Sequence, residues 1–356
     1  MEKKSGSSAP VRIAVIGLGM MGKIHVEKAS SIDDIEITAI CDIDRSTKDW
    51  SENLGIKSYH DHIEMLENED LDGVIISLSN DLHETMGIDC AARGLDILME
   101  KPIASSIRAA QKLIESVNKN GVRMLVAHQR RFNSMVNTAR EMIRGGELGD
   151  MVVISVIGCM CKPDQYFVDG PWRKKKISGG PVLINMIHEI DVLRYTYGDI
   201  ERVYAEASNK VRKFEVEDSV SVSMRFKEGA LATILMSDTV PSLWGYDYNM
   251  GEIPIFYKTK GEAYTFMGTR ASLTVPGMKK VYYPDPACIG WQHPLKVDNI
   301  EVNIKDPYIE QLKHFCNVVR GKEEPRTSGE DALKTLEATM AILESGYRNK
   351  PVEMGN

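Results

Sequence analysis

The stretch of residues 11–25, VRIAVIGLGMMGKIH, constrains the fold more than any other part of the chain. A short apolar run ends in a turn with three glycines, and a helical pattern follows at once. In the G-x-G-x-x-G spacing the first glycine permits a tight turn, the second lets the backbone approach a pyrophosphate, and the third lets helix and strand pack closely. The sequence therefore predicts a dinucleotide site formed by Gly17, Gly19, Met20, Met21 and Gly22.

A carboxylate closes the second predicted strand, IEITAICD. Asp42 stands 20 residues after Gly22, where it would accept hydrogen bonds from the adenosine ribose hydroxyls. A carboxylate there also repels a 2'-phosphate, so we expect NAD as the cofactor. Arg45 keeps NADP as the less favoured alternative, because a guanidinium could hold that phosphate.

Short apolar runs alternate with amphipathic stretches through residues 11–126, which predicts an α/β fold. At this spacing the expected architecture is a Rossmann domain, a doubly wound parallel sheet with helices on both faces, over residues 11–127. A disordered tail is expected at residues 1–10. The chain is too long for one hydrophobic core, so a second domain is expected as well.

The pattern of apolar and polar residues changes after residue 150. Long alternating segments such as SVSVSMRF and PIFYKT indicate strands of a large open, mostly antiparallel sheet, and KEG at 227–229 is typical of a hairpin turn. Helical pattern returns at 307–319 and 328–348, where Ser328 and Asp331 resemble a capping pair. We therefore expect an α+β domain for substrate binding and oligomerisation over residues 128–356.

The composition excludes several classes of function. The net charge of -7, with acids and bases interspersed, gives no basic stripe for nucleic acid. No apolar run approaches the ~18 residues that a membrane span needs. Six scattered cysteines without a disulfide framework favour a cytoplasmic setting. The segments YHDH and CMC lack a second half at zinc-site spacing, so we predict no metal. Because the charge pattern gives no basic stripe, we expect small molecules or other protein chains as partners.

Three segments together resemble a known family. The segments IGLGMMGKIH, SLSNDLHETMGIDCAARGLDILMEKPIA and GGPVLINMIHEIDVLRYTYGD are similar to those of the Gfo/Idh/MocA oxidoreductases, the glucose-fructose oxidoreductase and inositol dehydrogenase family. The resemblance extends over residues 11–352. It implies an N-terminal Rossmann domain, a C-terminal open sheet, nicotinamide in the cleft between them, and a homodimer or homotetramer formed through the C-terminal sheet.

The resemblance also implies roles for individual residues. Ser77, Asn80 and His83 would line the cofactor path, and Gln129 would approach the cofactor. Glu100 and Lys101 would reach the nicotinamide end, and the peptide bond before Pro102 would be cis.

Oxidation of an alcohol by NAD needs a base for the hydroxyl proton and a charge that favours the developing alkoxide. Lys101 follows a buried strand of the parallel sheet, where ligand crevices form, and suits the second role. His188 is the natural base, since imidazole titrates near neutrality.

One position departs from the family pattern. Inositol dehydrogenase-like members place an aspartate four residues before this histidine, and here that position is Ile184, with Asn185 beside it. Asn185 can hydrogen-bond a substrate hydroxyl or the imidazole, but it cannot act as a base at neutral pH. Asp191 could orient the ring of His188, and the alternatives are an acid on the helix surface or a structural salt bridge.

The segment PDQYFVDGPWRKKKISGG has the aromatic and cationic content of a sugar-binding loop. Trp172 could stack on a sugar or on the nicotinamide, and Arg173 could bind hydroxyls or phosphate. Tyr166 and Arg131 are further substrate-side candidates, whereas the lysines at 174–176 are interpreted as a solvated run.

These observations predict an NAD-dependent oxidoreductase that transfers a hydride between the nicotinamide and a secondary ring hydroxyl of a sugar, glycoside or cyclitol. One alternative is oxidation of a glycoside ring by tightly bound, recycled NAD, which forms a 3-keto-glycoside. The other is a non-catalytic NAD-sensing protein, which would need neither Lys101 nor His188.

Overall fold

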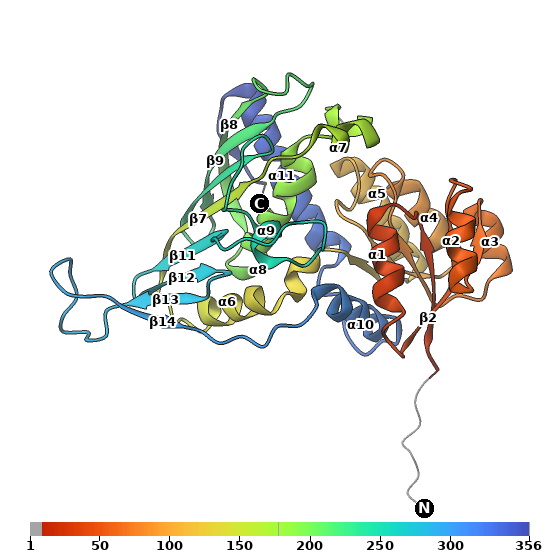
Figure 1. Ribbon diagram of the computed structural model, residues 1–356, viewed down its shortest axis with the longest axis horizontal. Coiled ribbons are helices and arrows are strands. Elements are labelled where there is room, and N and C mark those ends of the chain that lie inside the picture. Colours follow the sequence, from red (N-terminus) through yellow and green to blue (C-terminus); the bar gives the residue numbers. More distant parts are fainter. Residues whose placement is uncertain (1–8, 177, 356) are drawn as a thin grey trace, which may run out of the picture. The chain divides into compact units, whose positions relative to one another are not determined.

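The computed structural model describes residues 9–176 and 178–355 (Figure 1). The chain divides into two compact units. The first holds the residues up to Gln129 together with Tyr308–Leu333, and the second holds Arg130–Pro307 together with the chain from Lys334 onward. The tail expected at residues 1–10 lies almost wholly outside the described residues.

The first unit contains a six-stranded parallel sheet in the order β3-β2-β1-β4-β5-β6. Its strands are β1 (Val11–Ile16), β2 (Ile35–Cys41), β3 (Lys57–Tyr59), β4 (Gly73–Ile76), β5 (Asp96–Met99) and β6 (Met124–Val126). Its helices are α1 (Met20–Ala29), α2 (Thr47–Leu54), α3 (His62–Asn68), α4 (His83–Ala92), α5 (Ile107–Asn120) and most of α10 (Pro307–Val319). The strand order reverses between β1 and β4, and such a switch point opens a ligand crevice at the carboxyl ends of the strands. The predicted Rossmann fold is confirmed.

The helix α10 belongs to the core of the first unit. Leu312, Phe315 and Cys316 are buried in one cluster with residues of the parallel sheet such as Ile13 and Leu98. The sequence had placed this helix in the domain over residues 128–356. An amphipathic pattern shows that a helix has an apolar face, but it does not name the core that this face covers.

The second unit contains a nine-stranded sheet in the order β14-β13-β12-β11-β7-β10-β9-β8-β15. Its strands are β7 (Met151–Cys159), β8 (Ile200–Ser208), β9 (Ser219–Phe226), β10 (Leu231–Ser237), β11 (Tyr264–Gly268), β12 (Ala271–Val275), β13 (Lys279–Tyr282), β14 (Lys296–Asn299) and β15 (Val352–Glu353). Neighbouring strands are antiparallel except β7 and β10, which run parallel. The expectation of a mostly antiparallel sheet is confirmed.

One face of this sheet is covered by helices (Figure 1). The helical segments in or entering this unit are 3-10 helix Gln129–Phe132, α6 (Ser134–Arg144), α7 (Asp164–Asp169), 3-10 helix Pro171–Lys174, π-helix Val182–Met186, α8 (Ile187–Thr196), α9 (Tyr246–Met250) and α11 (Gly329–Arg348). Val136, Leu193 and Ile342 on α6, α8 and α11 share a core with Ile154 and Ile234 of the sheet. Alternation along each strand therefore buries one set of side chains and leaves the other set on an open face.

The turn chemistry follows the sequence in most places. Gly229 has φ +99° in the hairpin between β9 and β10, as the KEG turn predicts, and Ser328 Oγ accepts a hydrogen bond from Asp331 N at 3.3 Å. The prediction of a strand at PIFYKT, residues 254–259, is wrong, because this segment forms no strand. Pro254 has no N–H for a ladder, and Thr259 N donates instead to Tyr248 O in α9.

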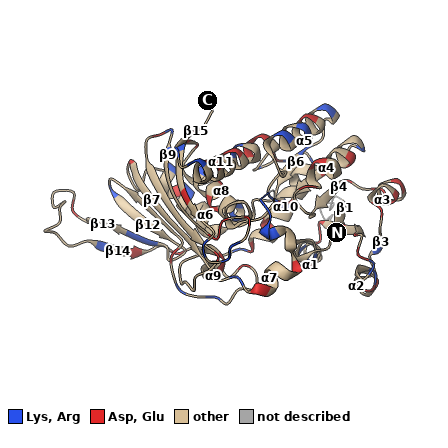
Figure 2. Ribbon diagram, turned by 90° about the horizontal axis from the view of Figure 1, so that it is seen from above, with Lys and Arg blue, Asp and Glu red and all other residues tan. Residues whose placement is uncertain are grey.

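No helix in residues 9–176 or 178–355 is long and apolar enough to cross a membrane. In Figure 2, basic and acidic residues both occur along α5. A mixture of this kind is typical of a solvated helix face.

Candidate active site

The glycine turn has the geometry that a dinucleotide requires. Gly17 has φ +92°, and a side chain there would meet Ser77 O at 2.2 Å. A Cβ on Gly22 would lie 1.9 Å from Gly17 O, so only glycine lets α1 pack this close to the turn. Gly19 has no neighbour within 4 Å, which leaves open space where a pyrophosphate can approach the backbone. The residues present therefore fit a dinucleotide.

Asp42 connects the glycine turn to the end of β2. Its Oδ2 accepts a hydrogen bond from Leu18 N at 2.5 Å, and its Oδ1 accepts one from Asp44 N at 2.8 Å. Each carboxylate oxygen has a second lone pair, so the ribose hydroxyls can still bind. Met20, on the first turn of α1, is 53% exposed, and Met21 is partly buried.

The residues after β4 differ in their surroundings. Ser77 is partly buried, Asn80 is 9% exposed, and both follow the carboxyl end of the strand. His83 is fully buried, with Nδ1 2.8 Å from Pro102 O and Nε2 3.1 Å from Leu78 O. Burial lowers the pKa of His83. We therefore assign His83 a supporting role between the two loops, since its ring has no exposed atom to offer a cofactor.

Glu100 and Lys101 follow β5 directly. Glu100 is 7% exposed and lies 2.8 Å from Nε2 of the fully buried His25, which the sequence reading missed. Its other oxygen accepts a hydrogen bond from Lys101 N at 3.2 Å. The peptide bond between Lys101 and Pro102 is cis, as the resemblance implied. Glu100 thus ties the turn that carries Lys101 to helix α1.

Gln129 follows β6 and is 7% exposed. The predicted cofactor residues of the first unit therefore follow the carboxyl ends of β1, β2, β4, β5 and β6. The carboxyl ends of parallel strands meet at one edge of a sheet, so these residues line the same edge.

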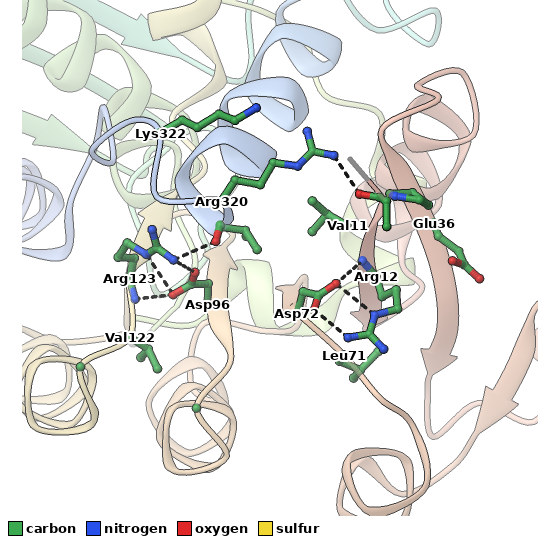
Figure 3. Close-up of a pocket in the computed structure, with 15 residues that line it drawn as sticks. Val11, Arg12, Glu36, Leu71, Asp72, Asp96, Val122, Arg123, Arg320 and Lys322 are labelled. Atoms are coloured by element: carbon green, nitrogen blue, oxygen red, sulfur yellow. Dashed lines mark hydrogen bonds and ion pairs between the residues drawn. The ribbon is translucent and has the colours of Figure 1, made fainter. Parts of the chain in front are cut away.

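A pocket of about 920 Å³ opens at the opposite edge of this sheet, at the amino ends of the strands (Figure 3). Arg12 pairs there with Asp72 at 2.8 Å, and Arg123 pairs with Asp96 at 2.7 Å. These arginines are neutralised, and ligands of parallel sheets bind at the carboxyl ends. We therefore do not assign the cofactor to this pocket.

In the second unit, a π-helical turn over Val182–Met186 leads into α8. Ile184 and Asn185 are partly buried, and His188 is 9% exposed, while the residues between them are buried. Ile184 and Asn185 precede His188 by four and three residues, the spacings at which helical side chains are neighbours. Single-turn π-helices are frequent at functional sites.

Glu189, the residue after His188, points into the core instead. Its Oε1 lies 2.7 Å from Nη1 of Arg130, which is 2% exposed, and its other oxygen accepts a hydrogen bond from the Tyr264 hydroxyl. The Arg130 guanidinium lies 3.7 Å above the ring of Tyr246. This buried pair fixes the start of α8 and hence the direction of His188.

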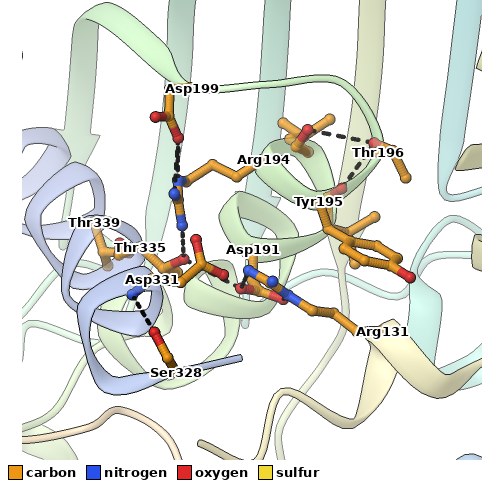
Figure 4. A network of polar contacts seen from close by, with 12 residues as sticks. Arg131, Asp191, Arg194, Tyr195, Thr196, Asp199, Ser328, Asp331, Thr335 and Thr339 are labelled. Atoms are coloured by element: carbon orange, nitrogen blue, oxygen red, sulfur yellow. Dashed lines mark hydrogen bonds and ion pairs between the residues drawn. The ribbon is translucent and has the colours of Figure 1, made fainter. Parts of the chain in front are cut away.

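Asp191 has a structural role. It accepts two hydrogen bonds from Arg131, at 2.8 Å and 2.6 Å, and one from Thr335 Oγ1 at 3.1 Å (Figure 4). Both charged side chains are almost fully buried. Of the roles the sequence left open for Asp191, the structure shows the salt bridge, and the same pair commits Arg131 to a structural role.

The loop before the π-helical turn brings three predicted residues together. The Arg173 guanidinium lies 3.8 Å from the centre of the Tyr166 ring and 5.2 Å from that of Trp172. Arg173 also donates to Tyr166 O, and no carboxylate pairs with it in the part of the chain that the structure describes. Burial raises the pKa of Tyr166, so its hydroxyl stays protonated. This stack of aromatic rings and a guanidinium suits a hydroxylated ring.

Two charged residues beside the π-helical turn over Val182–Met186 were not predicted from the sequence. Lys162 is 8% exposed, and its Nζ lies 2.6 Å from Asn185 Oδ1. Glu217 is 7% exposed and accepts a hydrogen bond from Val182 N at 3.0 Å. Burial raises the pKa of Glu217 to about 7. Neither residue belongs to a sequence motif. Their positions just after β7 and just before β9 are the only signal that could have identified them as candidates.

Among the described residues, no three His, Cys, Asp or Glu side chains gather as a metal would require. His62 of the YHDH segment lies 2.9 Å from Asp89, and His60 contacts Asp42 O. Of the CMC segment, Cys159 is buried and Cys161 is exposed. The absence of a metal stays a prediction.

Comparisons with known proteins extend this description. Residues 11–128 match the family described as "Oxidoreductase family, NAD-binding Rossmann fold", and residues 136–274 match the "GFO/IDH/MocA C-terminal domain". The myo-inositol 2-dehydrogenase of Thermotoga maritima is 28% identical over 357 residues, 97% of this chain and 98% of that protein. The scyllo-inositol 2-dehydrogenase (NAD(+)) of Bacillus subtilis is 25% identical over 97% of this chain and 96% of that protein.

The WlbA dehydrogenase of Bordetella pertussis, solved with NADH and UDP-GlcNAcA, has a TM-score of 0.79 at 22% identity, over 98% of this chain and 99% of that chain. At this identity the likeness shows the fold alone. The two family matches fall one in each of the two compact units and agree with the glycine turn and the open sheet. The chain therefore belongs to the GFO/IDH/MocA family of oxidoreductases, and its N-terminal domain is the NAD-binding Rossmann domain of that family.

Proposed function

We propose that this oxidoreductase transfers a hydride between NAD and a secondary ring hydroxyl of a sugar, glycoside or cyclitol, and so interconverts it with a keto-sugar. The observation that carries the proposal is the strand-end turn of Glu100 and Lys101. It places a lysine at the carboxyl edge of an NAD-binding sheet and fixes its backbone through a buried carboxylate. Relatives named as inositol and D-apiose dehydrogenases support the substrate class.

When bound, NAD supplies or accepts the hydride. The Lys101 ammonium donates to the reacting oxygen and lowers the energy of its developing negative charge. His188 takes the hydroxyl proton in oxidation and returns it in reduction. Ile184 offers no carboxylate beside His188. Lys101 and His188 therefore share the proton transfer. Asn185, Tyr166, Trp172 and Arg173 hold the substrate ring.

The choice of NAD over NADP rests on Asp42. Its two oxygens already bind the backbone at Leu18 and Asp44, so the carboxylate is held rigidly where the adenosine ribose binds. A 2'-phosphate would bring a second negative charge against it, and this repulsion favours NAD.

We further propose a homodimer or homotetramer formed through the open face of the nine-stranded sheet. Leu231 and Leu235 on β10 are 44% and 51% exposed, and they pair across the sheet with Val153 and Ile157 on β7. Exposed apolar side chains on a sheet face favour a second copy of the chain as the covering surface. Light scattering at micromolar concentration tests this, and a monomer would contradict it.

The test of the proposed reaction is NADH formation, followed by absorbance, with NAD+ and a panel of myo-inositol, scyllo-inositol, D-apiose, D-glucose and methyl glucosides. We expect turnover of at least one ring polyol or sugar, and a higher kcat/KM with NAD+ than with NADP+. The matched control is the Lys101→Met variant. If no member of the panel reduces NAD+ and bound NADH reduces no keto-sugar, the proposed reaction is wrong.

A further inference from the structure

The parallel pairing of β7 and β10 brings two buried charges to one end of the sheet in the second unit. Lys162 follows β7, Asp238 follows β10, and Lys162 N donates to Asp238 O at 2.9 Å. Their side chains are also paired, with Nζ 3.7 Å from Asp238 Oδ2. Lys162 and Asp238 are 8% and 2% exposed. A lysine this deeply buried needs such a partner to remain charged.

The same ammonium contacts the substrate helix. Its Nζ lies 2.6 Å from the side-chain oxygen of Asn185 and 5.0 Å from the centre of the Tyr166 ring. An ammonium has three donors and no acceptor, so the amide atom that faces it has to be the oxygen. Lys162 therefore fixes the orientation of the Asn185 amide, with the oxygen toward the ammonium and the nitrogen away from it.

The other end of the amide is available to a ligand. The nitrogen of Asn185 donates to no residue in 9–176 or 178–355, and Asn185 is only partly buried. Asn185 lies three residues before His188 and shares its helix face. The NH2 group of this amide is consequently a donor on the face of the helix that carries the proposed base.

We propose that Lys162 is a positioning residue that holds Asn185 as a hydrogen-bond donor to a substrate oxygen beside His188. The inference rests on the proposed function and deepens it. An aspartate, which the family resemblance implies near this position, could only accept a hydrogen bond when ionised. This chain instead presents the NH2 group of Asn185, held by the Lys162 ammonium, as a hydrogen-bond donor. The substrate oxygen that it binds therefore acts as an acceptor, and a hydroxyl oxygen, a ring oxygen or a keto oxygen of a sugar fits this role.

The kinetic test uses a double-mutant cycle in the holoenzyme with the best polyol of the panel. The variants are Lys162→Met, Asn185→Ala and the double variant, and Lys227→Met in the exposed hairpin turn is the matched control. We expect each single variant to raise KM about tenfold, the value of one hydrogen bond to a ligand, with kcat changed less than KM. The KM of the double variant should be no higher than that of Asn185→Ala, because Lys162 affects substrate binding through that amide. Losses that multiply in the double variant would overturn the proposal.

The donor role is tested by Asn185→Asp. A carboxylate there would pair with Lys162 and would offer no N–H to the substrate. The variant should therefore raise KM at least as much as Asn185→Ala, although it restores an acid near the position where relatives carry one. A KM equal to or below that of the unaltered enzyme would overturn the proposal.

A spectroscopic measurement separates this inference from the proposed reaction. In protein labelled with 15N-asparagine and saturated with NAD+, the side-chain NH2 signal of Asn185 is assigned by its loss in Asn185→Asp. We expect Lys162→Met to move this signal and Lys227→Met to leave it in place, because Lys162 donates to the amide oxygen and Lys227 does not. An unmoved signal in Lys162→Met would refute the contact even if sugars are turned over. A moved signal with no turnover would instead count against the reaction alone.

Discussion

Nε2 of His25 lies 2.8 Å from Oε1 of Glu100, and both side chains are buried in the Rossmann unit. Burial alone would raise the pKa of Glu100, but the hydrogen bond from His25 and the charge of Lys101 outweigh it and hold this pKa below its ordinary value. The carboxylate therefore stays charged next to the proposed catalytic lysine. Helix α1, which starts at the dinucleotide turn, and the turn after β5 are thereby joined at one point.

Replacement of Glu100 by Gln tests this contact. A group whose pKa is lowered by folding stabilises the protein above the unfolded pKa, and this stability is lost as the pH falls through the folded pKa. We expect Glu100→Gln to lower the free energy of unfolding by about 1–3 kcal/mol at pH 7, and the difference should vanish in acid. Thermal unfolding as a function of pH measures it, with the exposed Glu115→Gln as control. Equal stability of both variants at pH 7 would refute the assignment.

The glycine turn gives a pair of opposite predictions. Gly22→Ala places a methyl group 1.9 Å from Gly17 O and should destabilise the fold by about 1–3 kcal/mol. Gly19→Ala has open space and an ordinary φ of -62°, so its melting temperature should stay near that of the unaltered protein. The added methyl group would stand where the pyrophosphate approaches, so NADH binding should weaken at least tenfold. Fluorescence titration with NADH measures it, and unchanged affinity would argue against this site.

The buried pair of Arg131 and Asp191 predicts a loss of stability without a change in chemistry. Asp191→Asn leaves the guanidinium buried beside an uncharged partner and should lower the free energy of unfolding by about 3–5 kcal/mol. Glu353→Gln breaks the exposed pair with Arg202 and should cost less than about 1 kcal/mol. The pH dependence of kcat should stay the same in Asp191→Asn. A shifted profile would mean that Asp191 acts on His188 after all.

Glu217 predicts a pH-dependent stability of the opposite sign to that of Glu100. Folding raises its pKa to about 7, because burial penalises the charged carboxylate. Its neutral form therefore stabilises the fold at low pH, and this contribution is lost as the pH rises from the unfolded pKa of about 4.3 towards 7. In Glu217→Gln the side chain still accepts from Val182 N but no longer titrates. The difference in melting temperature between the two proteins should change over this pH range, and a constant difference would contradict the assignment.

Much of the Rossmann unit could be predicted from the sequence, because its signals are local. The glycine spacing, the acid at Asp42 and the alternation of apolar runs with amphipathic stretches are read within about 30 residues of chain. The limits of α10 and α11 also follow the pattern closely, at Pro307–Val319 and Gly329–Arg348. The packing of α10 against Leu98 and Ile13 could not be predicted, since a helical pattern does not identify the core it joins.

The substrate side was harder to predict because its contacts are long-range. Lys162 follows β7 and Asn185 lies on the π-helical turn before α8, so these residues are 23 positions apart in the sequence and meet only in the folded chain. Asp191 has the spacing of an imidazole partner on a helix, but the ion pair it forms with Arg131, 60 residues away, has no sequence signal. Sequence spacing along one helix cannot show which face is covered by another element.

The most direct test of the central claim is the turnover of Lys101→Met with saturating NAD+ and the best polyol of the panel. Lys119→Met, at the exposed end of α5, is the matched control. We predict that Lys101→Met lowers kcat at least about 100-fold, because the developing alkoxide loses its cation, while the affinity for NADH stays within a few-fold. A kcat within twofold of the unaltered enzyme would contradict the assignment of Lys101 as the residue that stabilises the reacting oxygen.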